Sequence, residues 1–109
     1  MATKANLLLD QGSTFSTTIT LTDENGDPLD LTGYSGRAQI RKHSSSNTAY
    51  DFTVDLANTT GEVTLSMSAN GTAAIPGGRY LYDVELIDHS NNVVRILEGI
   101  ISVDPEITK

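Results

Sequence analysis

The chain has 109 residues, and its fourteen acidic and seven basic side chains give a formal net charge of −7 at pH 7. A chain of this length buries roughly 65% of its unfolded surface, which is enough for one hydrophobic core and one domain. The acidic excess argues against binding to nucleic acid or to an anionic membrane, because both require Lys and Arg opposite phosphate groups. The chain contains no cysteine, which excludes disulfides, thiolate metal sites and cysteine nucleophiles.

The N-terminal third predicts strands separated by polar turns. Residues 14–22 alternate strictly, and one face is made of Phe15, Thr17, Ile19 and Leu21. This period of two, with many β-branched residues, is typical of a half-buried strand. A turn is expected at 23–28, because Asn25 and Gly26 both accept a positive φ. Residues 29–31 are then expected to form a short return strand.

The middle of the chain continues the pattern and offers one helix. Residues 35–42 alternate again, and the inward positions are Gly36, Ala38 and Ile40. Further strands are predicted at 50–54 and at 63–67. The segment 69–75 is the only helical candidate, and Pro76 ends it because proline cannot continue a helix.

Two long strand-forming runs, 78–86 and 93–103, predict the last hairpin, with residues 88–92 as its polar turn. The second run has apolar residues in both alternating registers. It is therefore either covered on both sides, or it contains a bulge near Gly99 that switches the inward face.

These elements predict an all-β fold, an immunoglobulin-like antiparallel β-sandwich of seven to eight strands. The sandwich is expected as a single domain over residues 1–109, with short flexible ends at 1–4 and 105–109. The shared registers predict a core of Phe15, Ile19, Leu21, Ile40, Phe52, Val54, Val63, Leu65, Tyr82, Val84, Leu97 and Ile101.

The spacing of Gly78, Tyr80 and Tyr82 matches the entry to the penultimate strand of immunoglobulin-like domains. Tyr80 is therefore a candidate tyrosine corner, whose hydroxyl would bond back to the preceding turn. The alternative is that Tyr80 is one more core aromatic. Tyr82 would take an inward position.

Asp23, Asn25 and Asp27 have the spacing that opens a calcium-binding loop. Pro28 follows at once, and no glutamate stands at the twelfth position, so a polar hairpin turn is the favoured interpretation.

Asp83 and Glu85 share one face of a strand, as paired catalytic carboxylates would. Solvated acids on a strand are far commoner, and Asp83 has the alternative of pairing with Arg95 across the hairpin. His43 and His89 lie in polar loops with no metal-ligand partner at a suitable spacing. We therefore predict no catalytic, cofactor-binding or metal-binding residue, and we do not expect an enzyme.

Two surfaces are candidates for docking onto another protein. One is a basic face made of Arg37, Arg41 and Lys42, with the alternative that these bases are merely solvated. The other is the free edge and the apolar outer face of the terminal strand, near Val94, Ile96 and Ile100.

Four short motifs extend over most of the chain. They are Leu-Thr-Gly-Tyr at 31–34 leading into Arg-Ala-Gln-Ile-Arg-Lys at 37–42, Gly-Glu-Val-Thr-Leu-Ser at 61–66, Ala-Ile-Pro-Gly-Gly-Arg-Tyr-Leu-Tyr-Asp-Val-Glu at 74–85, and Val-Arg-Ile-Leu-Glu-Gly at 94–99. Together they resemble a group of tailed-phage virion proteins, as in marine and cyanobacterial phages. More loosely, they are similar to the amino-terminal β-sandwich modules of phage baseplate upper proteins.

The resemblance implies a virion structural protein whose partners are other capsid or tail proteins, present in several copies or as a homo-oligomer. It implies no catalytic residues. The chain starts at Met1 and stops shortly after Val103, so we expect a stand-alone domain. This favours a capsid decoration or cement protein over a neck, tail or baseplate adaptor. The alternative function is a host-surface or carbohydrate-binding module, which the absence of Trp disfavours.

No segment of the sequence predicts export or membrane insertion. Residues 1–9 lack the apolar core of a secretion signal, and no apolar stretch approaches the ~20 residues of a membrane span. We therefore expect the protein to stay inside the cell that made it or to leave by lysis or within an assembly. The resemblance implies that its place is the virion.

Overall fold

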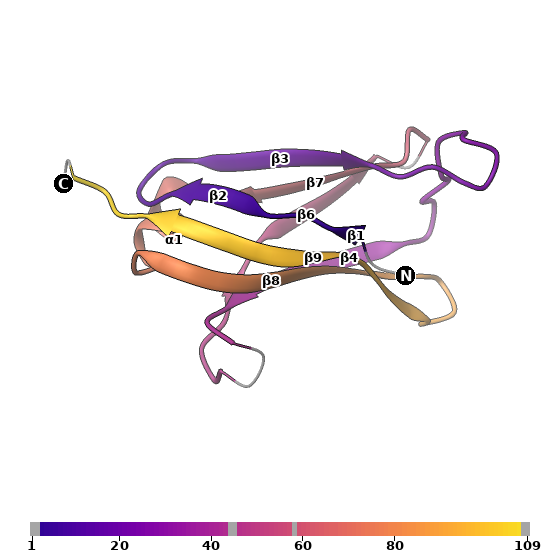
Figure 1. Ribbon diagram of the computed structural model, residues 1–109. Helices are drawn as coiled ribbons and strands as arrows, with labels where there is room; N and C mark the ends of the chain where they lie inside the picture. The colour runs from indigo at the N-terminus through magenta and orange to yellow at the C-terminus, as the bar shows by residue number, and fades with distance from the viewer. Residues whose placement is uncertain (1–2, 44–45, 58, 108–109) are drawn as a thin grey trace.

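The computed structural model describes residues 3–43, 46–57 and 59–107, which fold into two packed β-sheets (Figure 1). The elements are β1 (Thr3–Lys4), β2 (Leu7–Asp10), β3 (Phe15–Thr20), β4 (Ser35–Arg41), β5 (Tyr50–Asp51), β6 (Thr53–Ala57), β7 (Glu62–Met67), α1 (Ala69–Ala73), β8 (Gly78–Ile87) and β9 (Val93–Asp104).

The larger sheet has the order β1-β9-β8-β4-β5, with β2 also paired to β9, and the smaller sheet has the order β3-β7-β6. This division of strands is that of an immunoglobulin-like sandwich, which confirms the predicted fold class. The sequence did not reveal that β1 and β2 pair with β9 in parallel, whereas the other ladders are antiparallel.

The predicted strand at 50–54 is divided between the two sheets. Tyr50 and Asp51 pair with β4, whereas Thr53 begins the pairing of β6 with β7. The change of sheet occurs at Phe52, whose N–H donates to the carbonyl of Ala38 at 3.0 Å. Alternation is the same on both sides of Phe52, so the sequence pattern alone does not show the crossing.

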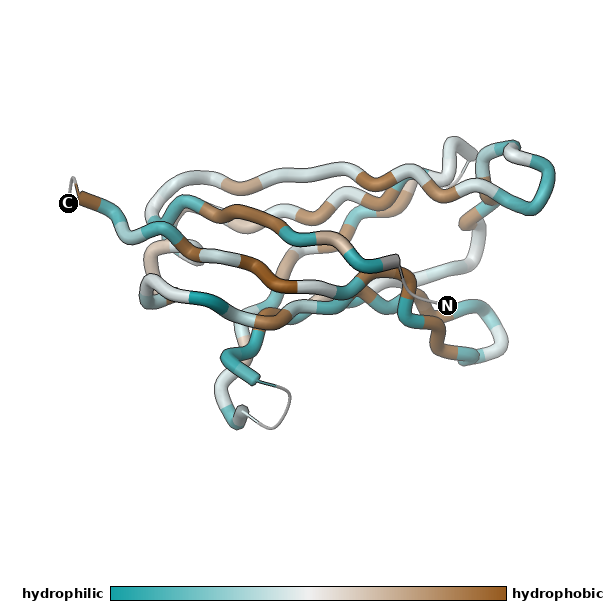
Figure 2. Tube along the Cα trace, viewed as in Figure 1, coloured by the Kyte–Doolittle hydropathy of each residue, from teal (hydrophilic) through white to brown (hydrophobic). Residues whose placement is uncertain are grey.

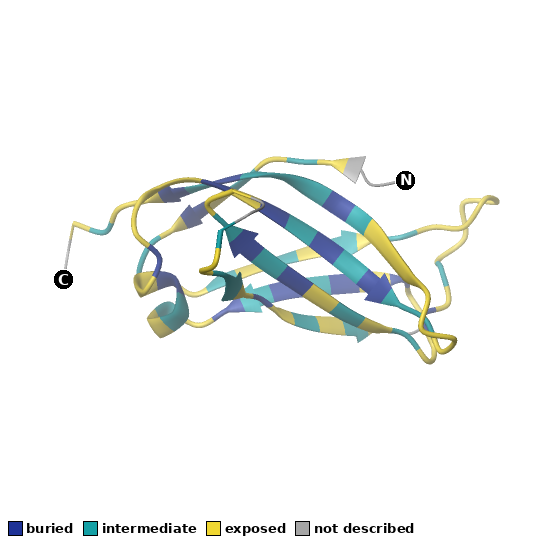
Figure 3. Cartoon of the chain, turned by 90° about the horizontal axis from the view of Figure 1, so that it is seen from below, coloured by how far each residue is buried: buried dark blue, intermediate teal, exposed yellow. Residues whose placement is uncertain are grey.

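The core fills the space between the sheets. Hydrophobic and hydrophilic positions alternate along the strands (Figure 2), and buried and more exposed residues form matching bands (Figure 3). Eight residues of the predicted core are buried: Ile40, Phe52, Val63, Leu65, Tyr82, Val84, Leu97 and Ile101. The other four are only half-buried because they lie on or beside the edge strands β3 and β6: Phe15, Ile19, Leu21 and Val54.

Tyr80 forms the predicted tyrosine corner. Its hydroxyl donates to the carbonyl of Pro76 at 2.6 Å, and its ring is buried at the start of β8. The bond ties β8 to the turn that follows α1. That helix begins where predicted, because the side chain of Ser68 accepts a hydrogen bond from the N–H of Gly71 at 3.1 Å.

The turn after β3 differs from the expected two-residue hairpin turn. Only Gly26 has a positive φ, of 85°, and Asn25 does not. The N–H of Gly26 donates to the carbonyl of Asp23, as in a type I turn followed by a left-handed glycine. The expected return strand at 29–31 does not form. Strand pairing across this turn is limited to one isolated bridge, between Thr22 and Pro28.

The bulge in the last strand lies at Ile96 rather than near Gly99. Val84 faces Leu97 whereas Glu85 faces Arg95, so Ile96 is the extra residue. Gly99 has a different role: a Cβ atom there would lie 1.9 Å from the carbonyl oxygen of Ala5. Glycine therefore allows the N-terminal segment to pass close to β9.

Both ends of the described chain are attached to the sandwich. Thr3 and Lys4, expected in a flexible end, pair with Leu97 and Glu98 of β9. Beyond the last strand, the N–H of Glu106 donates to the Gln11 side chain at 2.8 Å. Residues 1–2 and 108–109 of the expected flexible ends lie outside the described residues.

Replacing Leu65 by alanine should lower the free energy of unfolding by about 2–5 kcal/mol, because Leu65 is fully buried between the sheets. Leu8→Ala is the matched control: this leucine is 60% exposed, and surface changes usually alter stability by less than ~0.5 kcal/mol. Chemical denaturation of both variants measures the difference. Equal stabilities would contradict the strand register.

Candidate functional site

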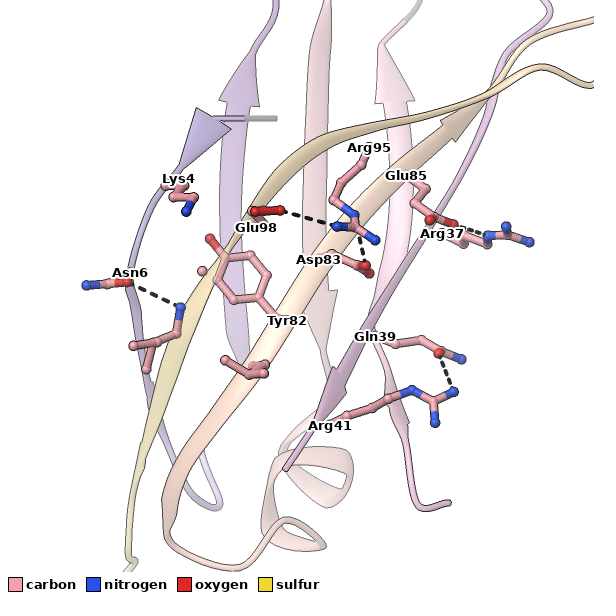
Figure 4. A pocket seen from close by; sticks show the side chains of 13 residues that line it. Lys4, Asn6, Arg37, Gln39, Arg41, Tyr82, Asp83, Glu85, Arg95 and Glu98 are labelled. Carbon is pink, nitrogen blue, oxygen red and sulfur yellow. Dashed lines mark hydrogen bonds and ion pairs between the residues drawn. The ribbon is translucent and has the colours of Figure 1, made fainter. Parts of the chain in front are cut away.

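An open hollow of about 700 Å³ lies on the solvent side of the larger sheet (Figure 4). Outward-pointing residues of β4, β8 and β9 line it, and Lys4 and Asn6 border it on the N-terminal side. We call this surface the outer face. Its charged residues are Lys4, Arg37, Arg41, Asp83, Glu85, Arg95 and Glu98.

Strand alternation places Arg37, Gln39 and Arg41 together on the outer side of β4. The β4–β8 register sets Arg37 opposite Glu85, and its Nε lies 2.7 Å from Glu85 Oε1. Arg41 donates to Gln39 Oε1 at 3.0 Å. The arginines of β4 are thus already oriented by neighbours on the sheet.

The bulge at Ile96 brings Arg95 to the same face as Glu98. Without the extra residue, Arg95 and Leu97 would share one side of β9. With it, Arg95 Nε lies 3.3 Å from Asp83 Oδ2, and Nη1 lies 3.3 Å from Glu98 Oε2. The predicted cross-hairpin pair of Asp83 and Arg95 is confirmed.

Asp83 is paired with Arg95 in this ion-pair network and is partly removed from water. Burial raises the pKa of its carboxyl, and the nearby charges of Glu85 and Glu98 act in the same direction. The guanidinium of Arg95 opposes this shift by favouring the charged form.

The N-terminal border of the hollow is fixed by two hydrogen bonds. The hydroxyl of Tyr82 donates to the carbonyl of Ala5 at 2.6 Å, and the N–H of Ile100 donates to Asn6 Oδ1 at 3.2 Å. Tyr82 stands opposite Gly99, which has no side chain to keep the N-terminal segment away. Lys4 is thereby held at the rim (Figure 4).

The outer face differs in charge from the rest of the protein. It holds four of the seven bases and three of the fourteen acids, so its formal charge is +1. The rest of the chain therefore carries −8, given the total of −7. This face is where the field repels another acidic protein least.

The charged residues of the outer face form ion pairs with one another. Glu85 is held by Arg37, and Asp83 by Arg95. Sequence analysis identified Arg37, Arg41, Asp83 and Glu85 separately. It missed Lys4, because only the parallel pairing of β1 with β9 brings that residue here.

The predicted basic face is divided. Arg37 and Arg41 lie on the outer face, but Lys42 does not line the hollow. Its Nζ lies 4.8 Å from the ring centroid of Tyr80, a cation–π contact. Lys42 follows the last residue of β4, where alternation directs it away from the two arginines.

The prediction that the terminal strand has a free edge and an apolar outer face is wrong for most of the length of β9. β1 and β2 cover the edge of β9 from Leu97 to Asp104. Ile100 lines the hollow, whereas Ile96 is the bulged residue and packs against the core. Val94 is exposed but stands opposite the buried Leu86, so the three residues do not share a face.

The Asp23 loop is a hydrogen-bonded turn, as the favoured interpretation predicted. Asp23 Oδ1 accepts hydrogen bonds from the N–H groups of Asn25 at 2.9 Å and Asp27 at 3.1 Å. Within residues 3–43, 46–57 and 59–107, no group of three or more His, Cys, Asp or Glu side chains is placed to hold a metal.

The two histidines lie apart from the outer face. The N–H of His43 donates to the side chain of Ser46 at 3.1 Å, in the loop after β4. His89 is exposed in the loop between β8 and β9, beside Gly33.

Comparison with known proteins identifies the fold but no family. No family model and no curated protein matches the chain. Its structure is similar to part of an internalin-like protein of Listeria monocytogenes, with a TM-score of 0.51 and 17% identity, over 94% of this chain and 28% of that one. The chain thus spans little more than a quarter of that protein, and at this identity the likeness concerns the fold alone. None of the described helices has the length and apolarity needed to cross a membrane.

Excess chelator should leave the melting temperature unchanged, because the carboxylate of Asp23 already accepts backbone hydrogen bonds within its own loop. Thermal unfolding with and without chelator measures this. A lower melting temperature that added calcium restores would contradict the assignment of this loop as a turn.

Titration followed by NMR should give Asp83 a pKa above the ordinary 3.8, and Arg95→Gln should raise it further, because the guanidinium opposes the shift. Since folded Asp83 holds its proton more tightly than the unfolded chain does, its contribution to stability increases as pH falls through the folded-state pKa towards 3.8. Asp88 is the internal control. Hydrogen bonds from Asn92 and Ser90 lower its pKa, so its stabilisation is lost as pH falls, and Arg95→Gln should not move it.

Proposed function

We propose that this chain is a structural protein of a tailed-phage virion, which docks on the particle through the outer face. The role that we prefer is that of a capsid decoration or cement protein, and the second choice is a neck, tail or baseplate adaptor. The motifs that resemble tailed-phage virion proteins support the class. The geometry of the outer face supports the mode of docking.

One observation carries the proposal: polar motif positions that are far apart in the sequence meet on one surface. Arg37, Gln39 and Arg41 come from the first motif, Asp83 from the third and Glu98 from the fourth, and all five line the hollow. The apolar residues of these motifs are explained by their positions in the corners and the core of a β-sandwich. A shared docking surface explains these five polar residues, whereas Lys42, Glu62 and Arg79 of the motifs lie off the hollow.

The arginines of the outer face have donors left for a partner. Arg37 and Arg95 remain 62% and 52% exposed although both are ion-paired, and a guanidinium has five N–H donors. Arginine is also enriched at protein interfaces, where its flat group binds carboxylates with two bonds. The surface therefore suits a partner that presents acidic side chains or backbone carbonyls.

A carbohydrate-binding module ranks below this proposal. Sugar sites commonly offer an exposed aromatic ring for stacking. All six aromatic residues lie in the described part of the chain, and each is buried or half-buried: Phe15, Tyr34, Tyr50, Phe52, Tyr80 and Tyr82. A glycan array separates the two functions, since the docking protein should bind no glycan on it.

Cosedimentation with purified capsids and, separately, with purified tails tests the proposal. The wild-type protein should pellet with one of the two, and binding should weaken as salt rises, because charge attraction is screened. Arg37→Glu combined with Arg41→Glu should abolish binding. Lys42→Glu combined with Arg79→Glu is the matched control, since it changes the net charge equally but affects residues off the outer face.

A thermal melt of each double variant shows whether the fold is intact. Leu81→Ala gives a second test without a charge change, because this exposed leucine lies within the hollow, and it should weaken binding while stability is kept. Binding by the Arg37/Arg41 variant at wild-type occupancy, or no pelleting of the wild type with either fraction, would contradict the proposal.

A further inference from the structure

β3 is an edge strand without the usual protection against pairing. It ends the smaller sheet, and no described residue pairs with its other side (Figure 1). Natural edge strands are commonly short, charged or interrupted by proline or bulges. Edge strand β5 has only two residues, and β6 carries Asp55 at its centre. β3 has six residues and contains no charge, proline or bulge.

The ladder with β7 shows which backbone groups of β3 face outward. The N–H of Leu21 donates to the carbonyl of Gly61, directly after the pair of Thr20 and Glu62. Because hydrogen-bonded and non-hydrogen-bonded pairs alternate in an antiparallel ladder, the odd residues of β3 bond to β7. The N–H and C=O groups of Ser16, Thr18 and Thr20 therefore point to the open edge.

A side-chain contact agrees with this assignment. Non-hydrogen-bonded pairs bring side chains closer together than hydrogen-bonded ones. The hydroxyl groups of Thr18 and Thr64 lie 3.1 Å apart in such a pair. The outer side of β3 thus presents small hydroxyl side chains next to unpaired backbone groups.

Apolar surface is left uncovered along the same edge. Phe15 and Ile19 point inward and pack against the core, yet both stay half-buried. Leu21, just beyond the strand, is also half-buried. An added strand at this edge would cover part of all three side chains, which favours association.

We infer that β3 pairs in antiparallel fashion with β3 of a second copy of this chain, about a twofold axis at Thr18. This register sets Thr18 opposite itself and Ser16 opposite Thr20, so all three outward-facing residues of each strand find partners within β3. It also sets Phe15 opposite Leu21 and Thr17 opposite Ile19 on the inner side. On the outer side of the new ladder, small hydroxyl side chains face one another. On its inner side, the facing residues are mainly apolar.

A second copy fits this edge better than an unrelated strand because the edge is self-complementary and neutral. The chain carries −7, and two copies repel each other over most of their surface. β3 contributes no charge to that repulsion. The inference does not depend on the virion function, and the outer face on the other sheet stays free in the pair.

Sedimentation velocity over a concentration series of the full chain is the first test. The wild type should form a dimer whose fraction rises with concentration. Thr18→Pro should weaken dimerisation roughly 10- to 100-fold, because each copy loses one edge hydrogen bond. Thr18→Lys should weaken it too, since two lysines then meet at the axis, whereas Thr64→Lys on the adjacent strand should not. Both lysine variants lose the same hydroxyl contact, so they are matched.

The absence of cysteine in the chain allows a second test that does not depend on dimer strength. Thr18→Cys should give a disulfide-linked dimer on oxidation, because the two residues of a hydrogen-bonded pair have Cα atoms about 5.5 Å apart, within the disulfide range of ~4.4–6.8 Å. Thr53→Cys, exposed on the other edge strand of the sheet, should stay reduced for longer.

Three results would overturn the inference. The first is a wild type that stays monomeric at every concentration together with a Thr18→Cys variant that gives no cross-link. The second is a folded Thr18→Pro variant that dimerises as well as the wild type, and the third is preferential cross-linking through Thr53→Cys. Association with capsids or tails but no self-association would contradict the inference and would leave the proposed function intact.

Discussion

The pairing of β8 with β9, with one extra residue at Ile96, determines how the core and the outer face are connected. On one side of the bulge Leu97 is buried opposite Val84, and on the other Arg95 stands opposite Glu85. A regular ladder would place Arg95 and Leu97 on the same side, so either a charge would be buried or a leucine exposed. The bulge avoids both outcomes, and it brings Arg95 close to Asp83 and Glu98.

The N-terminal segment completes this arrangement by covering the outer edge of β9. The contact requires a glycine at 99, because any side chain would collide with the carbonyl of Ala5, and that carbonyl accepts the hydroxyl of Tyr82. With β9 covered, the terminal strand is not the exposed edge of the molecule. The smaller sheet has no equivalent cover, since β1 and β2 both pair in the larger sheet before the chain crosses to the smaller one, and β3 is left open.

Two surfaces with different chemistry result, and they belong to different sheets. The outer face is charged but nearly balanced, and its arginines suit partners with acidic groups or carbonyls. The β3 edge is neutral and offers backbone hydrogen bonds, which suit another extended strand. Because the surfaces do not overlap, docking onto a particle and pairing with a second copy are compatible in one molecule.

Elements with a local signal could be predicted from the amino-acid sequence. Alternation predicted most of the strands, eight of the twelve expected core residues and the fold class, and the Gly78–Tyr82 spacing predicted the tyrosine corner that Pro76 completes. The tertiary structure decided what depends on contacts between distant segments: the parallel pairing of the N-terminal segment, the change of sheet at Phe52 and the position of the bulge. A period of two is the same for an edge strand, a covered strand and a strand that changes sheets. The neighbours of each strand therefore had to be known before Phe15 and Ile19 could be placed at a half-exposed edge, or Lys4 beside Arg95 on one face.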